Sequence, residues 1–217
     1  NGVIKDAFWL RVYWRFNLAK QPLHSGEYRM TPGMTAEGLI GLWQRGEVVQ
    51  YSLTLVEGWT FRQVLAALRA AEHLDDDIGR KSPSELMVQL GYAGRHPEGR
   101  FFPDTYRYAK RSPASGVLRQ AAQAMQQQLD AAWAQRQPGL PLKNADEALI
   151  LASIVEKETG QAADRGQVAA VFINRLRIGM RLQTDPTVIY GLGERFDGNL
   201  RKRDLQADTP YNSYTRS

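Results

Sequence analysis

An internal repeat constrains the fold of this chain more than any other feature of its sequence. Residues 33–40 (GMTAEGLI) match residues 58–65 (GWTFRQVL), 25 positions further along. In each copy a glycine stands two positions before a threonine, and an apolar pair follows. Because glycine permits a tight turn and threonine caps the N-terminus of a helix, each copy predicts a turn that leads into a helix.

The segments around the second copy predict a strand before the turn and an amphipathic helix after it. Three apolar residues alternate before the turn, as in a half-buried strand: Tyr51, Leu53 and Leu55. Four apolar residues share one face of the helix that follows: Phe61, Val64, Leu65 and Leu68. The repeat therefore predicts two strand–helix units on a small sheet.

The repeat also resembles the Gly-Asp-Thr turn and helix of LysM glycan-binding modules, with Met34 and Trp59 in place of the aspartate. A repeat of this kind serves more often to pack a module than to bind sugar. Upstream of it, residues 6–19 carry aromatic side chains spaced as on one face of a helix. They predict an amphipathic helix packed on the module, and a surface near a membrane interface is the alternative.

Residues 144–160 (NADEALILASIVEKETG) predict the helix that carries the chemistry. Asn144 and Glu147 have the spacing of a capping box, and Gly160 suits the position just after the helix. Two glutamates occupy the last turn. At about 100° per residue, Glu158 lies within about 60° of the apolar stripe, and Glu156 points the opposite way. The stripe consists of Leu151, Ile154 and Val155.

This spacing predicts that Glu158 lies at the edge of the core and that Glu156 faces solvent. A carboxyl group against apolar neighbours is desolvated, which favours the protonated form that a general acid requires. The ordinary alternative is a glutamate in a surface salt bridge. A negative charge at the C-terminus of a helix opposes the helix dipole, so this position for Glu158 favours a functional role.

The helix and the segments around it resemble the MltG/YceG-like family of endolytic murein transglycosylases. The matching segments are 102–106 (FPDTY), 151–159 (LASIVEKET), 171–176 (VFINRL), 180–191 (MRLQTDPTVIYG) and 209–215 (TPYNSYT). Glu158 and Thr159 are also similar to the Glu-Ser pair that ends the catalytic helix of lysozyme-like lytic transglycosylases. That similarity again favours Glu158 over Glu156 as the catalytic residue.

The resemblance implies a lyase-type enzyme that acts on peptidoglycan without a cofactor. Such an enzyme cleaves the β-1,4 bond between N-acetylmuramic acid and N-acetylglucosamine inside a glycan strand and leaves a 1,6-anhydro end. Glu158 alone would act first as general acid and then as base. The resemblance further implies termination or release of nascent strands, peptidoglycan synthases as partners, and a place on the periplasmic face of the bacterial inner membrane.

Polar and aromatic residues near the end of the chain are the candidates for sugar binding. They are Gln183, Thr184, Asp185, Tyr190, Tyr211, Asn212 and Tyr214. Their amides and hydroxyls would bind polar groups of the sugars, and their aromatic faces would contact the rings. A structural role is favoured for three of them: a place in the core for Tyr190 and Tyr214, and for Asp185 a cap on a helix that begins near residue 186.

Composition and charge exclude several classes of protein. The chain has no cysteine, which excludes disulfides and a cysteine nucleophile, and its three histidines lack the spacing of metal ligands. No run of about 18 apolar residues could span a membrane. The net charge of +5 suits an anionic polymer such as peptidoglycan as well as a solvated surface. Without a strongly basic helix or a known motif, it does not indicate a nucleic-acid partner.

We therefore expect an α+β protein with a small LysM-like strand–helix repeat module in residues 1–78. A mainly helical, lysozyme-like catalytic domain would follow in residues 79–217. Relative to the family, we expect the chain to lack an N-terminal anchor, its only link to a membrane, and a closing C-terminal region. Two other functions stay open: a lysozyme-like hydrolase in which Asp185 assists Glu158, and a non-catalytic module that binds or scaffolds peptidoglycan.

Overall fold

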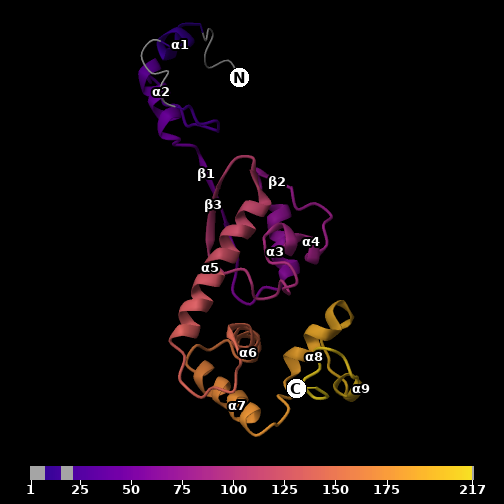
Figure 1. Cartoon of the computed structure of the whole chain (residues 1–217). Coiled ribbons are helices and arrows are strands. Elements are labelled where there is room, and N and C mark those ends of the chain that lie inside the picture. The colour runs from indigo at the N-terminus through magenta and orange to yellow at the C-terminus, as the bar shows by residue number, and fades with distance from the viewer. Residues whose placement is uncertain (1–7, 16–21, 217) are drawn as a thin grey trace. The chain divides into compact units, whose positions relative to one another are not determined.

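The computed structural model describes residues 8–15 and 22–216, and it has an α+β fold of helices and short strands (Figure 1). The chain forms two compact units, each discontinuous in sequence. The first contains Asn1–Leu55, Gln63–Gly94 and Pro103–Gln120, and the second contains Val56–Arg62, Arg95–Phe102 and Ala121–Ser217. The boundary predicted at residue 78 lies inside the first unit, and two short early segments belong to the second.

The described residues of the first unit form four short strands and several helices. Its strands are β1 (Gln50–Thr54), β2 (Leu74–Asp75), β3 (Thr105–Ala109) and β4 (Ser112–Pro113). β1 pairs with β3 in antiparallel register, with Leu53 opposite Tyr106, and β2 pairs with β4 in parallel. The helices that lie wholly or mostly in this unit are α1 (Phe8–Tyr13), α2 (Ala36–Arg45), α3 (Phe61–Ala70) and α4 (Pro83–Gln89). α5 (Ala114–Ala134) begins here and continues into the second unit.

Both turns of the repeat lead into helices, as predicted. The hydroxyl of Thr35 caps α2 by accepting a hydrogen bond from the N–H of Gly38 at 3.1 Å. The apolar face predicted for α3 is buried: Phe61, Val64, Leu65 and Leu68. The prediction of two strand–helix units is wrong for the first copy, because the described residues 22–34 before α2 contain no strand. The strand of the second copy, β1, pairs instead with β3, which follows much later in the chain.

The aromatic segment near the start of the chain contains α1, as predicted. The side chains of Trp9 and Tyr13 and the whole of Phe16 lie outside the described residues, so the predicted apolar face remains a prediction. Phe8 is exposed. In the parts of the chain that the structure describes, no helix is both long and apolar enough to cross a membrane.

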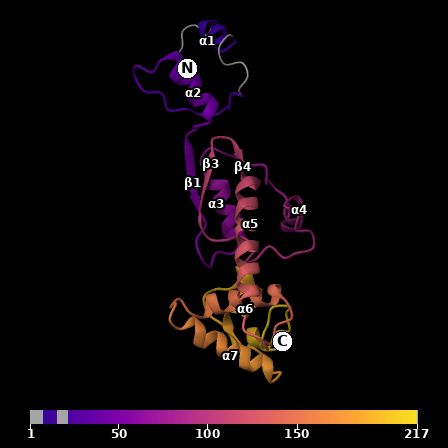
Figure 2. The same ribbon diagram turned by 60° about the vertical axis from the view of Figure 1, so that its left-hand side comes forward.

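The second unit is mainly helical and carries the candidate site. After α5 come α6 (Ala145–Glu158), α7 (Arg165–Arg177), α8 (Asp185–Leu192), the 3-10 helix η2 (Gly193–Arg195) and α9 (Lys202–Gln206). α6 contacts both α7 and α8, and α6 and α7 lie close together at the lower end of Figure 2. Their buried core consists of Leu151, Ile154, Val155 and Phe172. This packing leaves the C-terminal end of α6 facing the segment that leads into α8.

The ends of α6 differ in part from the prediction. Asn144 caps the helix, since its Oδ1 accepts a hydrogen bond from the N–H of Glu147 at 2.9 Å. The carboxylate of Glu147 accepts from the N–H of Lys143 at 2.7 Å instead of from Asn144, so the capping box is incomplete. The helix ends at Glu158 because Thr159 is extended, and Gly160 follows just after the helix, as predicted, without a left-handed φ.

Candidate active site

The last residue of α6, Glu158, meets Thr184, the residue that precedes α8. The hydroxyl of Thr184 donates a hydrogen bond of 2.6 Å to Oε2 of Glu158. Thr184 is 2% exposed, whereas Glu158 is an exposed residue. Among the described residues, the Glu158 carboxylate makes no other hydrogen bond or ion pair. One carboxylate oxygen is therefore fixed from inside the protein, and the other is open to a bound molecule.

This arrangement corrects the predicted burial of the two glutamates. The apolar stripe of α6 is buried as predicted: Leu151, Ile154 and Val155. Glu158 nevertheless lies exposed, because α6 ends there and no further turn continues the stripe over it. Glu156 is half-buried, and its Oε2 lies 3.2 Å from Nη2 of Arg165. The feature that distinguishes Glu158 is its hydrogen bond to Thr184, not desolvation by apolar neighbours.

Two further hydroxyl groups hold Thr184 in place. The N–H of Thr184 donates to Oγ of Ser213 at 3.0 Å, and its carbonyl accepts from Oγ1 of Thr187 at 2.8 Å. The hydroxyls of Thr187 and Ser213 lie 2.8 Å apart. Neither residue was predicted as part of the site. The one signal in the sequence was that Ser213 stands between Asn212 and Tyr214, two residues that were predicted.

The neighbours of Thr184 have different surroundings. Gln183 is exposed with a left-handed φ of 50°, and its N–H donates to the carbonyl of Ser213 at 3.1 Å. Asp185 begins α8 rather than capping it, and its carboxylate accepts a hydrogen bond from the hydroxyl of Tyr214 at 2.6 Å. That bond, together with burial and the charges of Asp185 and Glu158, raises the pKa of Tyr214 to about 12. Tyr214 is half-buried beside the site and not deep in the core.

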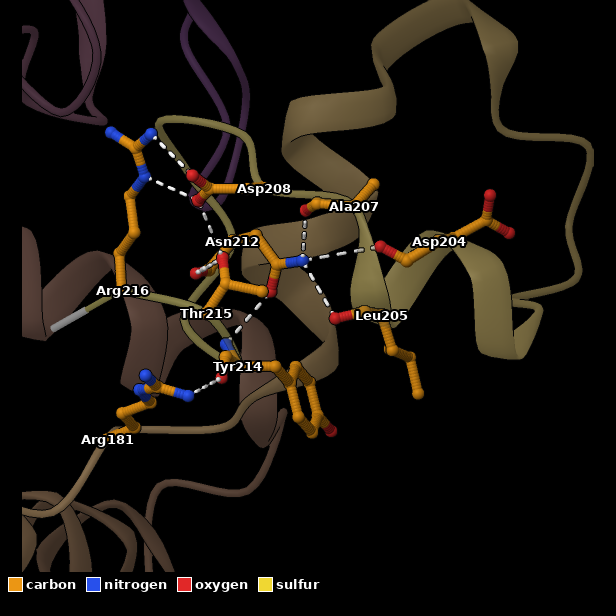
Figure 3. A network of polar contacts seen from close by, with 9 residues as sticks. All are labelled: Arg181, Asp204, Leu205, Ala207, Asp208, Asn212, Tyr214, Thr215 and Arg216. Carbon is orange, nitrogen blue, oxygen red and sulfur yellow. Dashed lines mark hydrogen bonds and ion pairs between the residues drawn. The ribbon is translucent and has the colours of Figure 1, made fainter.

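Asn212 is buried, and it supports the loop after α9 through the contacts drawn in Figure 3. Its amide nitrogen lies 2.7–3.3 Å from three backbone carbonyls, those of Asp204, Leu205 and Ala207. Its Oδ1 accepts a hydrogen bond from the N–H of Tyr214 at 2.9 Å. At 1% exposure and with these contacts inside the protein, Asn212 does not reach a sugar in this structure, contrary to the prediction. It fixes the loop that carries Tyr214.

Two arginines brace the same loop (Figure 3). The guanidinium of Arg216 contacts both oxygens of Asp208, at 2.6 Å and 2.9 Å. This contact, with a hydrogen bond from the hydroxyl of Thr215, lowers the pKa of Asp208 to about 2. Arg181 donates a hydrogen bond of 3.0 Å to the carbonyl of Tyr214. Neither arginine was predicted as a site residue, and their role is to hold the backbone around Tyr214.

Tyr190 and Tyr211, both predicted to bind sugar, form an aromatic pair at the other end of α8. Their ring centroids lie 4.9 Å apart with an interplanar angle of 79°. Tyr190 is 38% exposed and so lies at the surface, not in the core as predicted, and Tyr211 is 45% exposed. The hydroxyl of Tyr190 donates to Oε1 of Glu98 at 3.1 Å. Burial and the charge of Glu98 raise the pKa of Tyr190, so its hydroxyl stays a donor.

The second turn of the repeat lies against the end of α6. A Cβ atom placed on Gly58, whose φ is 73°, would lie 3.5 Å from Nζ of Lys157 and 3.7 Å from Oε1 of Glu156. Three residues further on, the N–H of Phe61 donates to Oε2 of Glu98 at 2.8 Å. This segment therefore connects the end of α6 with the carboxylate that holds Tyr190. The sequence did not predict that connection.

The arrangement suits proton transfer by one carboxylate. A carboxyl group with one oxygen held and the other open can give a proton to a bound substrate and take one back. The carboxylate of Asp185 is already engaged by Tyr214. Within the described parts of the chain, no group of three or more His, Asp or Glu side chains could hold a metal ion.

The chain is similar in sequence to one protein family and to bacterial proteins. A model of the YceG-like family matches residues 1–217. The chain is 30% identical to an endolytic murein transglycosylase of Bacillus subtilis over 234 residues, which cover 99% of this chain and 63% of that protein. It is 27% identical to an endolytic murein transglycosylase of Streptococcus pneumoniae over 248 residues, which cover 98% and 44%. The chain thus spans less than two thirds of the length of both.

A solved structure is similar to this chain over nearly its whole length. It is the crystal structure of a yceG-like protein from Listeria monocytogenes, which shares 28% sequence identity with this chain. The match has a TM-score of 0.55 and covers 98% of this chain and 75% of that chain.

Proposed function

This chain belongs to the YceG-like family, and on that premise we propose that it cleaves peptidoglycan as an endolytic lytic transglycosylase. The bond cleaved is the β-1,4 bond between N-acetylmuramic acid and N-acetylglucosamine inside a glycan strand. The product carries a 1,6-anhydro-N-acetylmuramic acid end, which terminates or releases a nascent strand. The names of the relatives from Bacillus subtilis and Streptococcus pneumoniae support this proposal. The observation that carries it is the hydrogen bond from Thr184 to Glu158.

In the first step Glu158 acts as general acid. Because Oε2 accepts the hydrogen bond from Thr184, we assign proton transfer to Oε1. Oε1 gives its proton to the bridging oxygen as the bond from that oxygen to the anomeric carbon of the muramic unit breaks. The N-acetylglucosamine side leaves with the proton. The N-acetyl group of the muramic unit stabilises the positive charge that develops at its anomeric carbon.

In the second step the same carboxylate acts as base. It accepts the proton of the 6-hydroxyl group of the muramic unit, and that oxygen bonds to the anomeric carbon to close the anhydro ring. Glu158 ends the cycle protonated, as it began, and no water is consumed. One carboxylate therefore suffices where most glycosidases use two. Excluding water from the anomeric carbon separates this reaction from hydrolysis.

Thr184 serves both steps in this mechanism. Oε2 remains a hydrogen-bond acceptor whether or not Oε1 carries the proton, so the bond to Thr184 persists throughout. The group that must move the proton therefore stays in one orientation, which lowers the cost of reaching the transition state. Gln183, exposed beside Thr184, is retained as a candidate sugar contact.

We extend the proposal to the organisation and setting of the protein. The second unit would act as a catalytic domain of the lysozyme-like kind, and the parts of the repeat that lie in the first unit would form a LysM-like module. The protein would work on the periplasmic face of the bacterial inner membrane, next to peptidoglycan synthases. Such a setting would deliver nascent strands directly to Glu158.

The test is mass analysis of the products formed from purified glycan strands by this chain, by Glu158→Gln and by Glu156→Gln. We expect anhydro ends with the unsubstituted chain and with Glu156→Gln, and none with Glu158→Gln. Reducing ends in place of anhydro ends would identify a hydrolase in which Asp185 assists. Binding of strands with no product from the unsubstituted chain would support the non-catalytic module. Loss of product only with Glu156→Gln would show that the acid has been assigned to the wrong residue.

A further inference from the structure

Four neighbouring side chains of the second unit, three of them exposed, form a surface that the two chemical steps do not use. They are His96, Glu98, Tyr190 and Tyr211, here called the tyrosine surface. Tyr190 and Tyr211 remain 38% and 45% exposed although each hydroxyl has a partner. The hydroxyl of Tyr190 donates to Glu98, and that of Tyr211 lies 3.4 Å from Nε2 of His96.

Glu98 connects two distant parts of the chain at this surface. Its Oε1 accepts from Tyr190, 92 positions later, and its Oε2 accepts from the N–H of Phe61, 37 positions earlier. With both oxygens engaged, the carboxylate has a defined orientation and holds the ring of Tyr190 in one place. An aromatic ring that is already held loses little conformational entropy when it binds a ligand.

The position of Tyr211 is set by close packing on α8. A Cβ atom placed on Gly191 would lie 3.4 Å from Cβ of Tyr211, so the loop packs directly on the helix. The ring of Tyr211 meets Tyr190 edge to face at 4.9 Å, a favoured geometry for two aromatic rings. The imidazole of His96 also meets the Tyr211 ring edge to face, with 6.4 Å between the ring centroids. The more exposed ring of the pair is thus supported by two neighbours.

α8 links this surface to Glu158. Thr184 precedes the helix, and Tyr190 lies six residues later, which is about 9 Å along the helix axis at 1.5 Å per residue. The turn at Gly58 gives a second link, since it lies against the last turn of α6 and leads to Phe61 and Glu98. The tyrosine surface is therefore close to the proposed reaction centre but separate from the groups that transfer protons.

We propose that the tyrosine surface binds a pyranose ring of the glycan strand next to the bond that Glu158 cleaves, with the sugar stacked on Tyr211. The C–H groups on one face of a pyranose are apolar and carry a slight positive charge, which suits the negative face of an aromatic ring. Glu98 and His96 lie beside the rings and supply polar groups for the hydroxyls and N-acetyl group of the sugar. The inference rests on the proposed function, because it takes the glycan strand as the ligand.

The test measures binding of peptide-free oligosaccharides of alternating N-acetylglucosamine and N-acetylmuramic acid. Calorimetry is performed in the Glu158→Gln background, so that nothing is turned over. We expect Tyr211→Ala to weaken binding by about five- to tenfold, since an aromatic contact of this kind contributes that much. Tyr211→Phe keeps the ring and should bind within about twofold of the background. Trp133→Ala on α5, whose ring is covered by Arg136 at 4.1 Å, is the matched control and should bind unchanged.

A second measurement needs no substitution at the surface. In the folded Glu158→Gln chain, titration with the oligosaccharide should shift the ring resonances of Tyr211 and Tyr190 and leave those of Tyr92 in place. Absence of binding, binding unaffected by Tyr211→Ala, or unshifted Tyr211 resonances would each overturn the inference.

The outcomes also separate this inference from the proposed function. If binding depends on Tyr211 but the chain yields no anhydro ends, the sugar-binding role of the tyrosine surface is supported and the proposed transglycosylase reaction is refuted. If the chain yields anhydro ends but its binding does not depend on Tyr211, the proposed reaction is supported and the sugar-binding role of the tyrosine surface is refuted.

Discussion

The hydroxyl of Thr184 donates a 2.6 Å hydrogen bond to the carboxylate of Glu158, a residue 26 positions earlier in the chain. The donor is buried and held by Ser213 and Thr187, whereas the acceptor is exposed. An exposed glutamate at a helix end ordinarily samples many rotamers. The bond restricts this one, which is what a proton-transfer group requires.

Thr184→Val removes the donor while keeping the shape of the side chain. A hydrogen bond to a charged group contributes about 1.5–3 kcal/mol, so we expect kcat for anhydro-end formation to fall about 10- to 100-fold. KM should change little, because Thr184 is buried and does not contact the substrate in this proposal. Steady-state product release measures both constants.

Two variants control this experiment. Thr184→Ser keeps the hydroxyl and should retain most of the activity. Thr105→Val makes the same change at an exposed hydroxyl of β3 and should have no effect on kcat. Equal activity of the Val and Ser variants at position 184 would contradict the role assigned to the hydroxyl.

Asn212→Ala should destabilise the protein. The substitution leaves buried backbone carbonyls and the N–H of Tyr214 without their partner, at a cost of about 2–3 kcal/mol in the free energy of unfolding. Urea denaturation measures the loss. Asn199→Ala, at an exposed position of the same unit, should change the free energy of unfolding by less than about 0.5 kcal/mol. Equal changes in the free energy of unfolding for the two variants would show that Asn212 does not hold the loop in place.

The hydrogen bond between Tyr214 and Asp185 predicts a pH effect at the alkaline end. It raises the pKa of Tyr214 to about 12 from an ordinary value of 10.0. The folded state therefore favours the neutral phenol, and its contribution to stability is complete below pH 10.0 and is lost as the pH rises toward about 12. Asp185→Ala should move the titration of Tyr214 toward 10.0, followed by NMR of the ring. An unchanged titration would show that another group holds the phenol neutral.

Asp77 caps α5 from a distant position in sequence, as its carboxylate accepts from the N–H of Ser115 at 2.9 Å and also from the Ser115 hydroxyl. Asp77→Ala should cost about 1–2 kcal/mol in the free energy of unfolding at neutral pH. Asp75→Ala, at an exposed position of β2, should cost little.

The same contact predicts an acid dependence. Burial raises the pKa of Asp77, but the hydrogen bonds from Ser115 outweigh it, so the net pKa is lowered below 3.8. The stabilisation is therefore present above pH 3.8 and is lost as the pH falls through the lowered value. Urea midpoints measured down this range should converge for the Asp77→Ala variant and the unsubstituted chain. A constant difference would mean that the carboxylate charge is not what holds Ser115.

Local features of the helices could be predicted because their causes lie within a few residues. The buried stripe of α6 and its cap at Asn144 follow from spacing at 3.6 residues per turn and from the free N–H groups of a helix start. The cap of α2 at Thr35 and the buried face of α3 follow in the same way. The same sequence also identified Glu158 as the candidate acid, through its family resemblance and its place in the last turn.

Contacts between distant segments could not be predicted from these patterns. Glu158 was predicted to be the more buried of the two glutamates, but Glu156 is. Their burial depends on the contact of Glu156 with Arg165 and on the residue at which α6 ends. The missing strand of the first repeat copy is of the same kind, since a strand exists only where a partner supplies its hydrogen bonds. Asn212 has the amide chemistry of a sugar contact, and only packing shows that three carbonyls surround it.

Propensity, periodicity and capping act over a single turn of chain, so the amino-acid sequence alone was enough to predict that α2, α3 and α6 are helical and which faces of α3 and α6 are buried. The hydroxyl that meets Glu158, the carboxylate that holds Tyr190 and the side chains that stay exposed follow only from the packing of the folded chain. The first two of these contacts join residues that are 26 and 92 positions apart in the sequence. Such pairs form only after the chain has lost the entropy of closing long loops, so they are set by the packing of the whole fold and not by any local pattern.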